Sequence, residues 1–302
     1  MESEQNKMLS TELIKKIRRI EIRTRRLVND SYAGEYHSIF KGRGMEFDEV
    51  HPYQIGDEIR SIDWNVTART GEPHVKRYVE ERELTVMLVV DASGSENFGS
   101  VNRFKRELAA ELTAVLSFAA TTNNDKVGLL IFTDRIELFI PPRKGRQHVL
   151  RLIRELLAFE PQSRGTDIKL ALDTVNQILK RRSIIFLVSD FLVPAESYQR
   201  ELTVTNKRND VISIDLHDPL EMSIKDVGLL ALEDPETDEM VWVDTSDPNW
   251  KDSYQLRTQL LEADKARIFK QSSVDRINIA TDEDYTASLT SFFQERARRI
   301  RR

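Results

Sequence analysis

The chain has 302 residues, a formal net charge of −5 and no cysteine. This length can bury one large core with a smaller appendage, and the acidic balance gives no whole-protein attraction to nucleic acid or anionic membranes. Without cysteine, disulfide bonds, thiolate zinc sites and cysteine nucleophiles are excluded. The N-terminus is too charged for a signal peptide and no apolar run approaches the ~20 residues that span a bilayer, so we expect a soluble, cytoplasmic protein.

Residues 1–82 are predicted to form a family-specific N-terminal segment in two parts. Leu9–Val28 has apolar residues at helical spacing, and we interpret its lysine- and arginine-rich face as solvated. Short stretches between glycines and prolines follow. In RSIDWNVTAR, apolar residues from Ile62 to Ala68 alternate with polar ones, which predicts a half-buried strand, and MEFDEV and HVKRYV are weaker strand candidates. We therefore expect a helix followed by a small β-rich elaboration.

Residues 83–302 are predicted to alternate strands with helices. Continuous apolar runs, typical of strands covered on both faces, occur at residues 84–90, 126–133, 183–190 and 210–216. Further strands are expected at residues 135–140 and 275–280, and a hairpin at 227–244. Helical spacing occurs at residues 103–119, 149–157, 168–180, 249–270 and 285–300. This alternation predicts an α/β fold with an open, mostly parallel sheet flanked by helices.

Three polar segments lie at the predicted edge of the sheet where open α/β folds bind ligands. Asp91-Ala92-Ser93-Gly94-Ser95 follows the first buried strand, Ser189-Asp190 ends the third, and Gly165-Thr166-Asp167 opens a helix. Together they offer two carboxylates and three hydroxyls from Asp91, Ser93, Ser95, Thr166 and Asp190. Such oxygen donors suit Mg²⁺, or another divalent cation such as Mn²⁺ or Ca²⁺.

Each polar segment alone fits ordinary capping and turn chemistry, and Asp167 is a standard helix cap. Their conjunction at one sheet edge favours a metal site. With mostly neutral hydroxyls around it, the ion would keep much of its charge and would favour a carboxylate from another protein. Glu96, directly after the second serine, adds a carboxylate that could tune or partly occupy the site.

The three segments resemble the metal-ion-dependent adhesion site of von Willebrand factor A domains, and this resemblance covers roughly residue 84 to the C-terminus. The preceding sequence, GRGMEFDEVHPYQIGDEIRSIDWNVTARTGEPHVKRYVEERELTV, resembles the signature of the bacterial domain of unknown function fifty-eight family. Members are commonly encoded beside a MoxR-type AAA+ ATPase. The resemblance therefore implies a MoxR-associated von Willebrand A-like protein. Glu96 departs from the pattern, because many members have methionine or another apolar residue there.

The favoured function is non-enzymatic: metal-dependent protein binding as an adaptor or co-chaperone of a MoxR-type ATPase, in the maturation of protein complexes or metal insertion. A glutamate or aspartate of the partner or client would complete the metal shell, and membrane contact would come only through partners. The first alternative is a Mg²⁺-dependent hydrolase, such as a phosphatase, although no nucleophile has a base at recognisable spacing. The second is nucleic-acid or anion binding through Arg296–Arg302, which the net charge disfavours.

A polar cluster in the N-terminal segment has two open interpretations. Asp57, Arg60, Asp63 and Arg69 lie close together in the sequence. We favour a structural hydrogen-bonded network, and the alternative is a surface on which a partner docks.

Overall fold

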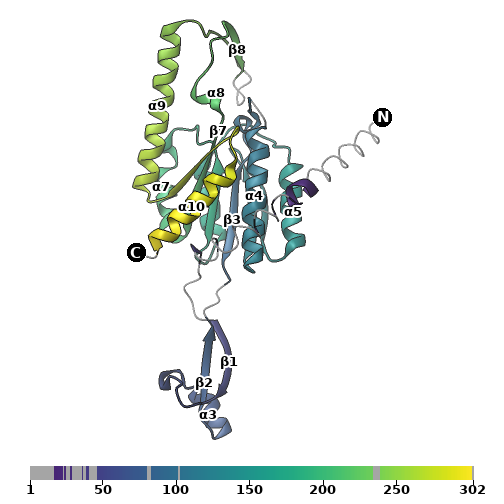
Figure 1. Ribbon diagram of the computed structural model, residues 1–302, viewed down its shortest axis with the longest axis vertical. Coiled ribbons are helices and arrows are strands. Elements are labelled where there is room, and N and C mark those ends of the chain that lie inside the picture. Colours follow the sequence, from purple (N-terminus) through teal and green to yellow (C-terminus); the bar gives the residue numbers. More distant parts are fainter. Residues whose placement is uncertain are drawn as a thin grey trace, which may run out of the picture.

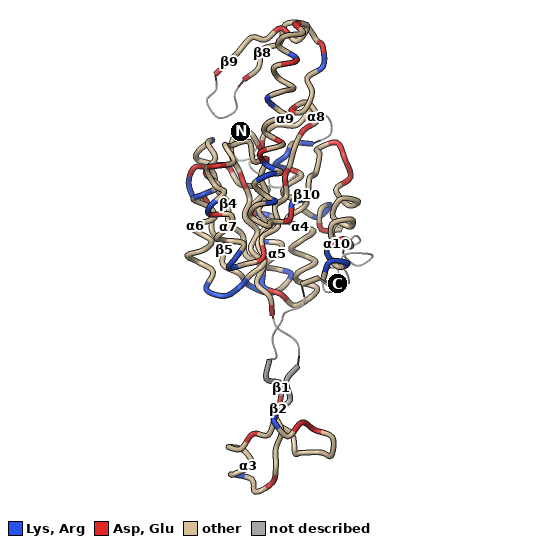
Figure 2. Tube along the Cα trace, turned by 90° about the vertical axis from the view of Figure 1, so that its left-hand side faces the viewer, with Lys and Arg blue, Asp and Glu red and all other residues tan. Residues whose placement is uncertain are grey.

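A six-stranded sheet with helices on both faces forms the centre of the molecule (Figure 1). The computed structural model describes residues 17–22, 24, 28, 36, 39–40, 46–79, 83–100, 103–233 and 239–300. Acidic and basic residues are interspersed over this described part of the chain (Figure 2). None of its helices has both the length and the apolar character needed to cross a membrane.

The strands of the central sheet run in the order β10-β7-β6-β3-β4-β5. They are β3 (Thr85–Asp91), β4 (Lys126–Phe132), β5 (Ile136–Arg143), β6 (Ile184–Ser189), β7 (Asp210–His217) and β10 (Asp275–Ala280). Strand β5 is antiparallel to β4, and the other pairs are parallel. From β3 the chain continues first on the β4 side and then on the β6 side, so the strand order reverses beside β3. The predicted mostly parallel α/β sheet is confirmed, and its ligand-binding edge lies at the carboxyl ends of β3 and β6.

Side chains of each central strand alternate between two cores. In β3, Val86 and Leu88 belong to one core while Met87 and Val89 belong to the other. Helices α4 (Lys105–Thr122), α5 (Arg146–Leu157) and α10 (Tyr285–Ile300) cover the first core. Helices α6 (Ile168–Ile178) and α7 (Gln199–Arg208) and the end of α9 (Pro248–Gln271) cover the second. Burial on both faces explains the continuous apolar runs in these strands.

Helix α7 is absent from the sequence predictions. Its buried residues are Leu202 and Thr205, so the apolar stripe that marks a helix in sequence is too sparse to recognise. Of the predicted helix Leu9–Val28, residues 17–22 and 24 are helical, and Ile20 and Val28 join the first core. The rest of that prediction lies outside the described residues.

A small unit precedes the central sheet and projects from the amino-terminal end of β3 (Figure 1). Strands β1 (Glu46–Pro52) and β2 (His74–Val79) form at the strand candidates MEFDEV and HVKRYV, and they pair antiparallel. The strand predicted in RSIDWNVTAR is wrong, because helix α3 (Trp64–Thr70) forms there. The Asp63 carboxylate starts this helix by accepting from the backbone N–H groups of Asn65 (2.9 Å) and Val66 (3.3 Å).

Asp57 and Asp63, two acidic residues of this unit, form local contacts. Asp57 accepts from the backbone N–H of Gln54 (2.8 Å), and Asp63 forms an ion pair with Lys76 (3.2 Å). Neither carboxylate forms an ion pair with Arg60 or Arg69, both of which are exposed. The predicted four-residue network is therefore absent from this described unit.

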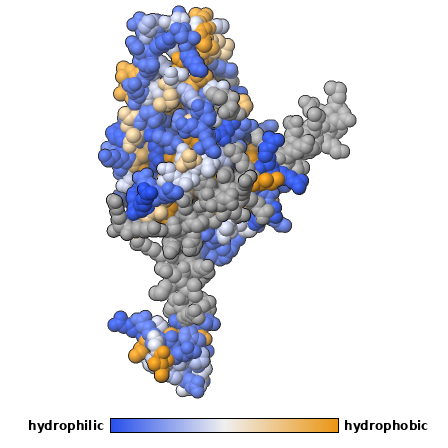
Figure 3. Space-filling view, viewed as in Figure 1, coloured by the Kyte–Doolittle hydropathy of each residue, from blue (hydrophilic) through white to orange (hydrophobic). Residues whose placement is uncertain are grey.

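A second unit, which we call the arm, projects from the opposite end of the sheet (Figures 1 and 2). It consists of α8 (Pro219–Met222), β8 (Leu229–Glu233), β9 (Met240–Asp244) and α9. Strands β8 and β9 form the predicted antiparallel hairpin. Figure 3 shows apolar side chains on the surface of the arm and of the N-terminal unit. Exposed large side chains on the hairpin include Leu229, Met240 and Trp242, each at least 60% exposed.

Candidate metal centre

The residues predicted to bind a metal lie at the carboxyl ends of neighbouring strands. Asp91 is the last residue of β3, and Asp190 directly follows β6. Strands β3 and β6 are parallel partners, with Val90 opposite Val188, so their ends bring the two aspartates to one place. The serines follow Asp91 in a turn that continues into a short 3₁₀ helix, η3 (Gly94–Asn97).

Three carboxylates converge at this edge, and we call them the acidic cluster: Asp91, Glu96 and Asp190. One oxygen of each lies within 4.8 Å of an oxygen of each of the others. All three side chains are buried. Asp91 is held in place because its Oδ1 accepts from the Ser93 backbone N–H (2.9 Å) and its Oδ2 accepts from the Ser189 hydroxyl (2.7 Å).

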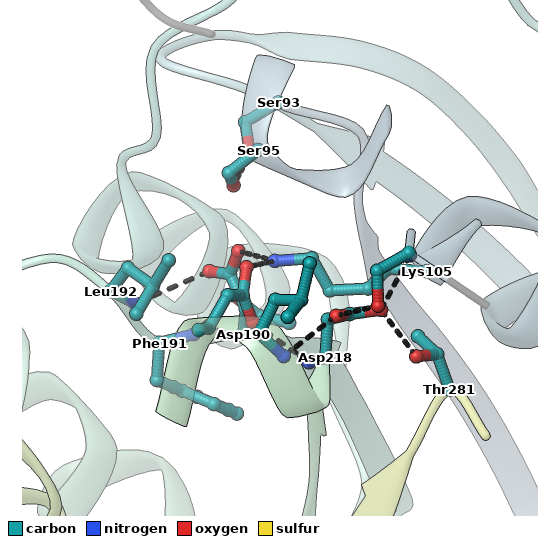
Figure 4. A network of polar contacts seen from close by, with 12 residues as sticks. Ser93, Ser95, Lys105, Asp190, Phe191, Leu192, Asp218 and Thr281 are labelled. Atoms are coloured by element: carbon teal, nitrogen blue, oxygen red, sulfur yellow. Dashed lines mark hydrogen bonds and ion pairs between the residues drawn. The ribbon is translucent and has the colours of Figure 1, made fainter. Parts of the chain in front are cut away.

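The two predicted serine ligands lie on the same side of the turn. Their hydroxyl oxygens are 3.2 Å apart and both side chains are buried. Figure 4 shows Ser93 and Ser95 on the turn above Asp190, with Ser95 directed toward it. The alternation of D-x-S-x-S therefore presents both hydroxyls together, as the sequence predicts.

Thr166 lies on the loop that packs beside the serine turn. The carbonyl of Arg164 accepts from the Gly94 N–H (2.8 Å), and the Asp167 N–H donates to the carbonyl of Thr133 (3.0 Å). Asp167 also caps α6, accepting from the Leu170 N–H (2.9 Å), as predicted. Thr166 is half-buried between these anchors. The metal-binding role of the five residues stays a prediction, but all three segments meet at this edge.

Glu96 differs from its neighbours because its carboxylate makes no hydrogen bond. Its side chain is 1% exposed, and both carboxylate oxygens lack a partner. Burial raises the pKa of Glu96 well above its ordinary value, and the nearby charges of Asp190 and Asp91 add to this effect. Most buried polar groups in folded proteins are hydrogen-bonded, so an orphaned carboxylate requires an explanation.

Lys105 is part of the site although the sequence analysis did not identify it. Its side chain is fully buried, and its Nζ donates to Asp190 Oδ2 (2.6 Å) and to Glu221 Oε1 (2.6 Å; Figure 4 shows the first contact). Burial acts to lower the pKa of Lys105, but the combined attraction of Asp190, Glu96 and Glu221 raises it above its ordinary value. Lys105 is therefore a fixed positive charge at the acidic cluster.

Lys105 was missed because a lysine in the first turn of a helix normally points into solvent. The one available signal was weak. A cation at a helix N-terminus opposes the helix dipole, so an acidic partner is expected nearby. Sequence alone does not show which acid this is, because Asp190 lies 85 positions away.

The capping residues of α8 hold Glu221 against Lys105. Glu221 Oε2 accepts from the Asp218 backbone N–H (2.8 Å), which completes a capping box. Asp218 in turn accepts from the hydroxyls of Ser100 (2.5 Å) and Thr281 (2.6 Å), as Figure 4 shows in part. The first element of the arm is therefore connected to the acidic cluster through Lys105.

The two aspartates of the cluster respond to their surroundings in opposite directions. Burial and the charge of Asp190 raise the pKa of Asp91 to about 7. Burial also acts to raise the pKa of Asp190, but its contact with Lys105 outweighs this and lowers the pKa. Lys105, which is shared with Glu221, thus stabilises the charge of Asp190 by direct contact, whereas the pKa values of Asp91 and Glu96 remain raised.

The donors at this edge fit a divalent cation. Carboxylate and hydroxyl oxygens are the ligands that Mg²⁺, Mn²⁺ and Ca²⁺ prefer. With all three carboxylates ionised, the cluster would set three negative charges against the single ammonium of Lys105, and the orphaned oxygens of Glu96 belong to it. A buried excess of negative charge is costly unless it is paired or binds a metal.

The strand order and the helices on both faces define an α/β domain with a mostly parallel central sheet, as predicted, and the acidic cluster lies at its ligand-binding edge. The chain belongs to the family described as "Protein of unknown function DUF58", whose model matches residues 49–263. The uncharacterised protein Rv1480 of Mycobacterium tuberculosis strain H37Rv is 31% identical over 284 residues, which is 93% of this chain and 89% of that protein.

Two solved structures resemble parts of this chain at low sequence identity. The conserved hypothetical protein BatB from Bacteroides thetaiotaomicron is 13% identical with a TM-score of 0.49, covering 71% of this chain and 99% of that one. Proximal thread matrix protein 1 from the mussel byssus, with a zinc-occupied MIDAS motif, is 16% identical with a TM-score of 0.37. That match covers 45% of this chain and 38% of the mussel protein.

Proposed function

We propose that this protein is a non-enzymatic, divalent-cation-dependent protein-interaction module that serves as an adaptor or co-chaperone of a MoxR-type AAA+ ATPase. The observation that carries the proposal is the acidic cluster itself. Three buried carboxylates meet at the ligand-binding edge of the sheet, and Glu96 has no hydrogen-bond partner there. Cytoplasmic location remains part of the same proposal.

The chain's own residues would hold the cation at the carboxyl ends of β3 and β6. Asp91 and Asp190 provide charge, and Ser93, Ser95 and Thr166 provide neutral oxygens from the adjoining turn and loop. Hydrogen bonds from Ser189 and from the Ser93 backbone orient Asp91 before any ligand binds. A bound divalent cation would supply attraction for a carboxylate from a partner or client protein.

The raised pKa of Lys105 supports a binding function over a hydrolytic one. A lysine that activates a serine must lose its proton, which requires a lowered pKa. The pKa of Lys105 is raised instead, because Asp190, Glu96 and Glu221 hold its charge against the effect of burial. The acidic cluster, as described, includes no histidine that could replace it as a base.

The arginine-rich C-terminus has internal partners, which supports assigning the binding function to the sheet edge. Arg296 forms ion pairs with Asp210 (2.5 Å) and Asp275 (2.9 Å). Arg299 forms a further pair with Asp275 (2.8 Å). These arginines attach α10 to the ends of β7 and β10 and have less charge to offer to a nucleic acid.

The arm supports a protein partner because it begins at the metal centre and exposes apolar side chains. Glu221 in α8 contacts Lys105, and the Tyr254 hydroxyl in α9 donates to the Glu221 carbonyl (2.9 Å). Leu229, Met240 and Trp242 are exposed on the hairpin. Exposed apolar patches on a protein surface are typical of protein-binding sites.

The test is a binding measurement between the purified full-length chain and a purified MoxR-type ATPase from the same organism. We expect binding in Mg²⁺ that is lost in EDTA and lost in Asp91→Asn. Asp282→Asn is the matched control, because Asp282 is exposed and lies outside the cluster. Binding that persists in EDTA and in Asp91→Asn would refute the metal-dependent interaction.

A further inference from the structure

Glu96 is the one member of the acidic cluster without a structural role in the protein alone. Asp91 accepts two hydrogen bonds that fix the turn and the end of β6. Asp190 accepts from Lys105 and from the Leu192 N–H (3.2 Å; Figure 4). Glu96 contacts no donor, although it is as deeply buried as the aspartates.

The position of Glu96 is fixed by the local backbone. Its N–H donates to the Ser93 carbonyl (3.2 Å), and the Phe98 N–H donates to the Ser95 carbonyl (3.2 Å), which forms the 3₁₀ turn η3. The turn places the Glu96 side chain on the interior side, with an oxygen within 4.8 Å of oxygens of Asp91 and Asp190. Lys105 forms ion pairs with Asp190 and Glu221, and none with Glu96.

A buried carboxylate with no donor is stable only when another group compensates it. Protonation would neutralise Glu96, but its two oxygens would still lack partners in the described structure. A cation between the three carboxylates satisfies all of them at once. Carboxylate oxygens from three separate chain positions are a usual ligand set for Mg²⁺, Mn²⁺ or Ca²⁺.

We propose that Glu96 is a third carboxylate ligand of the cation held by Asp91 and Asp190. The inference rests on the proposed metal site and adds a property to it. A site made mostly of hydroxyl ligands leaves one coordination position for a carboxylate of another protein. Glu96 of the same chain occupies that position. A partner's acidic residue must therefore replace Glu96, and the free protein holds its metal in a self-closed state.

The first test is Mn²⁺ binding to the metal-free full-length chain, measured by calorimetry for the natural protein, Glu96→Gln and Glu96→Ala. Loss of a charged ligand is expected to weaken Mn²⁺ binding by at least about tenfold in both variants. Glu295→Gln is the matched control, because Glu295 is exposed on α10, and it should bind as the natural protein does. Unchanged affinity in Glu96→Gln and Glu96→Ala would overturn the inference.

The second test asks whether Glu96 occupies a coordination position. Water-proton relaxation by bound Mn²⁺ reports the number of coordinated waters, and we expect a higher value in Glu96→Ala than in the natural protein. Acetate should then displace water from Mn²⁺ in Glu96→Ala and have no such effect in the natural protein. Equal relaxation in the two proteins, with no response to acetate in either, would overturn the assignment of Glu96 as a ligand.

Asp91→Asn separates this inference from the proposed metal site. If the natural protein binds Mn²⁺, Asp91→Asn does not, and Glu96→Gln and Glu96→Ala bind normally, then the metal site stands and the role of Glu96 is refuted. If the natural protein binds no Mn²⁺, both fail. Circular dichroism of each metal-free variant establishes that lost binding is not lost folding.

Discussion

A buried group and a partly buried group of charged residues lie side by side in this protein, and only the second has as many cations as carboxylates. We call the second group the balanced network: Asp215, Glu262, Lys265 and Arg276. Arg276 Nε donates to Asp215 Oδ2 (2.9 Å), and Lys265 Nζ forms an ion pair with Glu262 (3.0 Å). Two cations thus face two carboxylates. The acidic cluster, in contrast, sets three carboxylates against one ammonium that it shares with Glu221.

The difference shows that burial of charge does not by itself mark a ligand site. The balanced network attaches the long helix α9 to β7 and β10, and Lys265 also donates to the Asp190 carbonyl (2.7 Å). Burial acts to raise the pKa of Asp215, and the two cations oppose this. Its charges are satisfied by the protein. In the acidic cluster, by contrast, the described residues provide no hydrogen-bond partner for Glu96.

The largest expected effect comes from removing either buried lysine. Lys105→Met removes the ammonium that contacts Asp190, and Lys265→Met removes one of the two cations that face Asp215. Each should lower the free energy of unfolding of the metal-free protein, by up to about 3–5 kcal/mol. Chemical denaturation in EDTA measures both losses. The two variants should look alike under this condition.

Metal should distinguish the two lysine variants. Saturating Mn²⁺ should recover a large part of the stability lost in Lys105→Met, because the cation replaces the ammonium beside Asp190. Mn²⁺ should stabilise Lys265→Met only as much as it stabilises the natural protein, because Asp215 and Glu262 lie outside the acidic cluster. The stability difference between those two proteins should therefore stay the same. Equal recovery of both variants, or of neither, would break the distinction between the two groups.

The next largest effect is stabilisation of the natural protein by metal. At a free Mn²⁺ concentration 100 times its dissociation constant, binding to the folded state should add about 2.7 kcal/mol to the free energy of unfolding. Thermal or chemical denaturation with Mn²⁺ and with EDTA measures this difference. In Asp91→Asn the difference should disappear, and a retained difference would place the metal elsewhere.

The pH dependence of the metal-free protein should reveal Asp91. Burial and Asp190 raise the pKa of Asp91 to about 7, so the folded protein keeps a proton that the unfolded chain loses near pH 4. This contribution to the free energy of unfolding is fully present below pH 4 and is lost as the pH rises to about 7. Subtracting the profile of Asp91→Asn isolates it. Parallel profiles of the two proteins between pH 4 and 7 would contradict the raised pKa.

The smallest expected effect comes from Glu262. Its contribution to the free energy of unfolding is lost as the pH falls, whereas that of Asp91 is lost as the pH rises. Burial acts to raise its pKa, but hydrogen bonding to Arg276 and the charge of Lys265 lower it overall. Glu262→Gln should lower the free energy of unfolding by about 1 kcal/mol at neutral pH. This loss should vanish as the pH falls below the ordinary pKa of glutamate and through the lowered pKa of Glu262. Mn²⁺ should not change it. If Mn²⁺ changed the effect of Glu262→Gln on the free energy of unfolding, the balanced network and the acidic cluster would have to be regarded as one site.

Much of the fold was accessible from sequence because burial on both faces leaves a strong signal. Runs such as residues 84–90 and 183–190 identified central strands, and polar residues at their ends identified the edge that holds Asp91 and Asp190. The RSIDWNVTAR stretch failed because its alternation is confined to a few residues, and Asp63 starts a helix that this pattern does not reveal.

The composition of the site was less accessible, because it depends on contacts between distant positions. Lys105 contacts Asp190 and Glu221, which are 85 and 116 positions away, and nothing at Lys105 itself indicates burial. Glu96 was noticed for its position after the serines. Its lack of any hydrogen-bond partner became apparent only from the three-dimensional arrangement.

The most direct test of the central claim is a calorimetric titration of the metal-free full-length chain with Mn²⁺. The cluster predicts one bound ion per chain in the natural protein, none in Asp91→Asn or Asp190→Asn, and one in the exposed control Asp282→Asn. Absence of binding to the natural protein, or normal binding to both cluster variants, would contradict a metal centre at the carboxyl ends of β3 and β6.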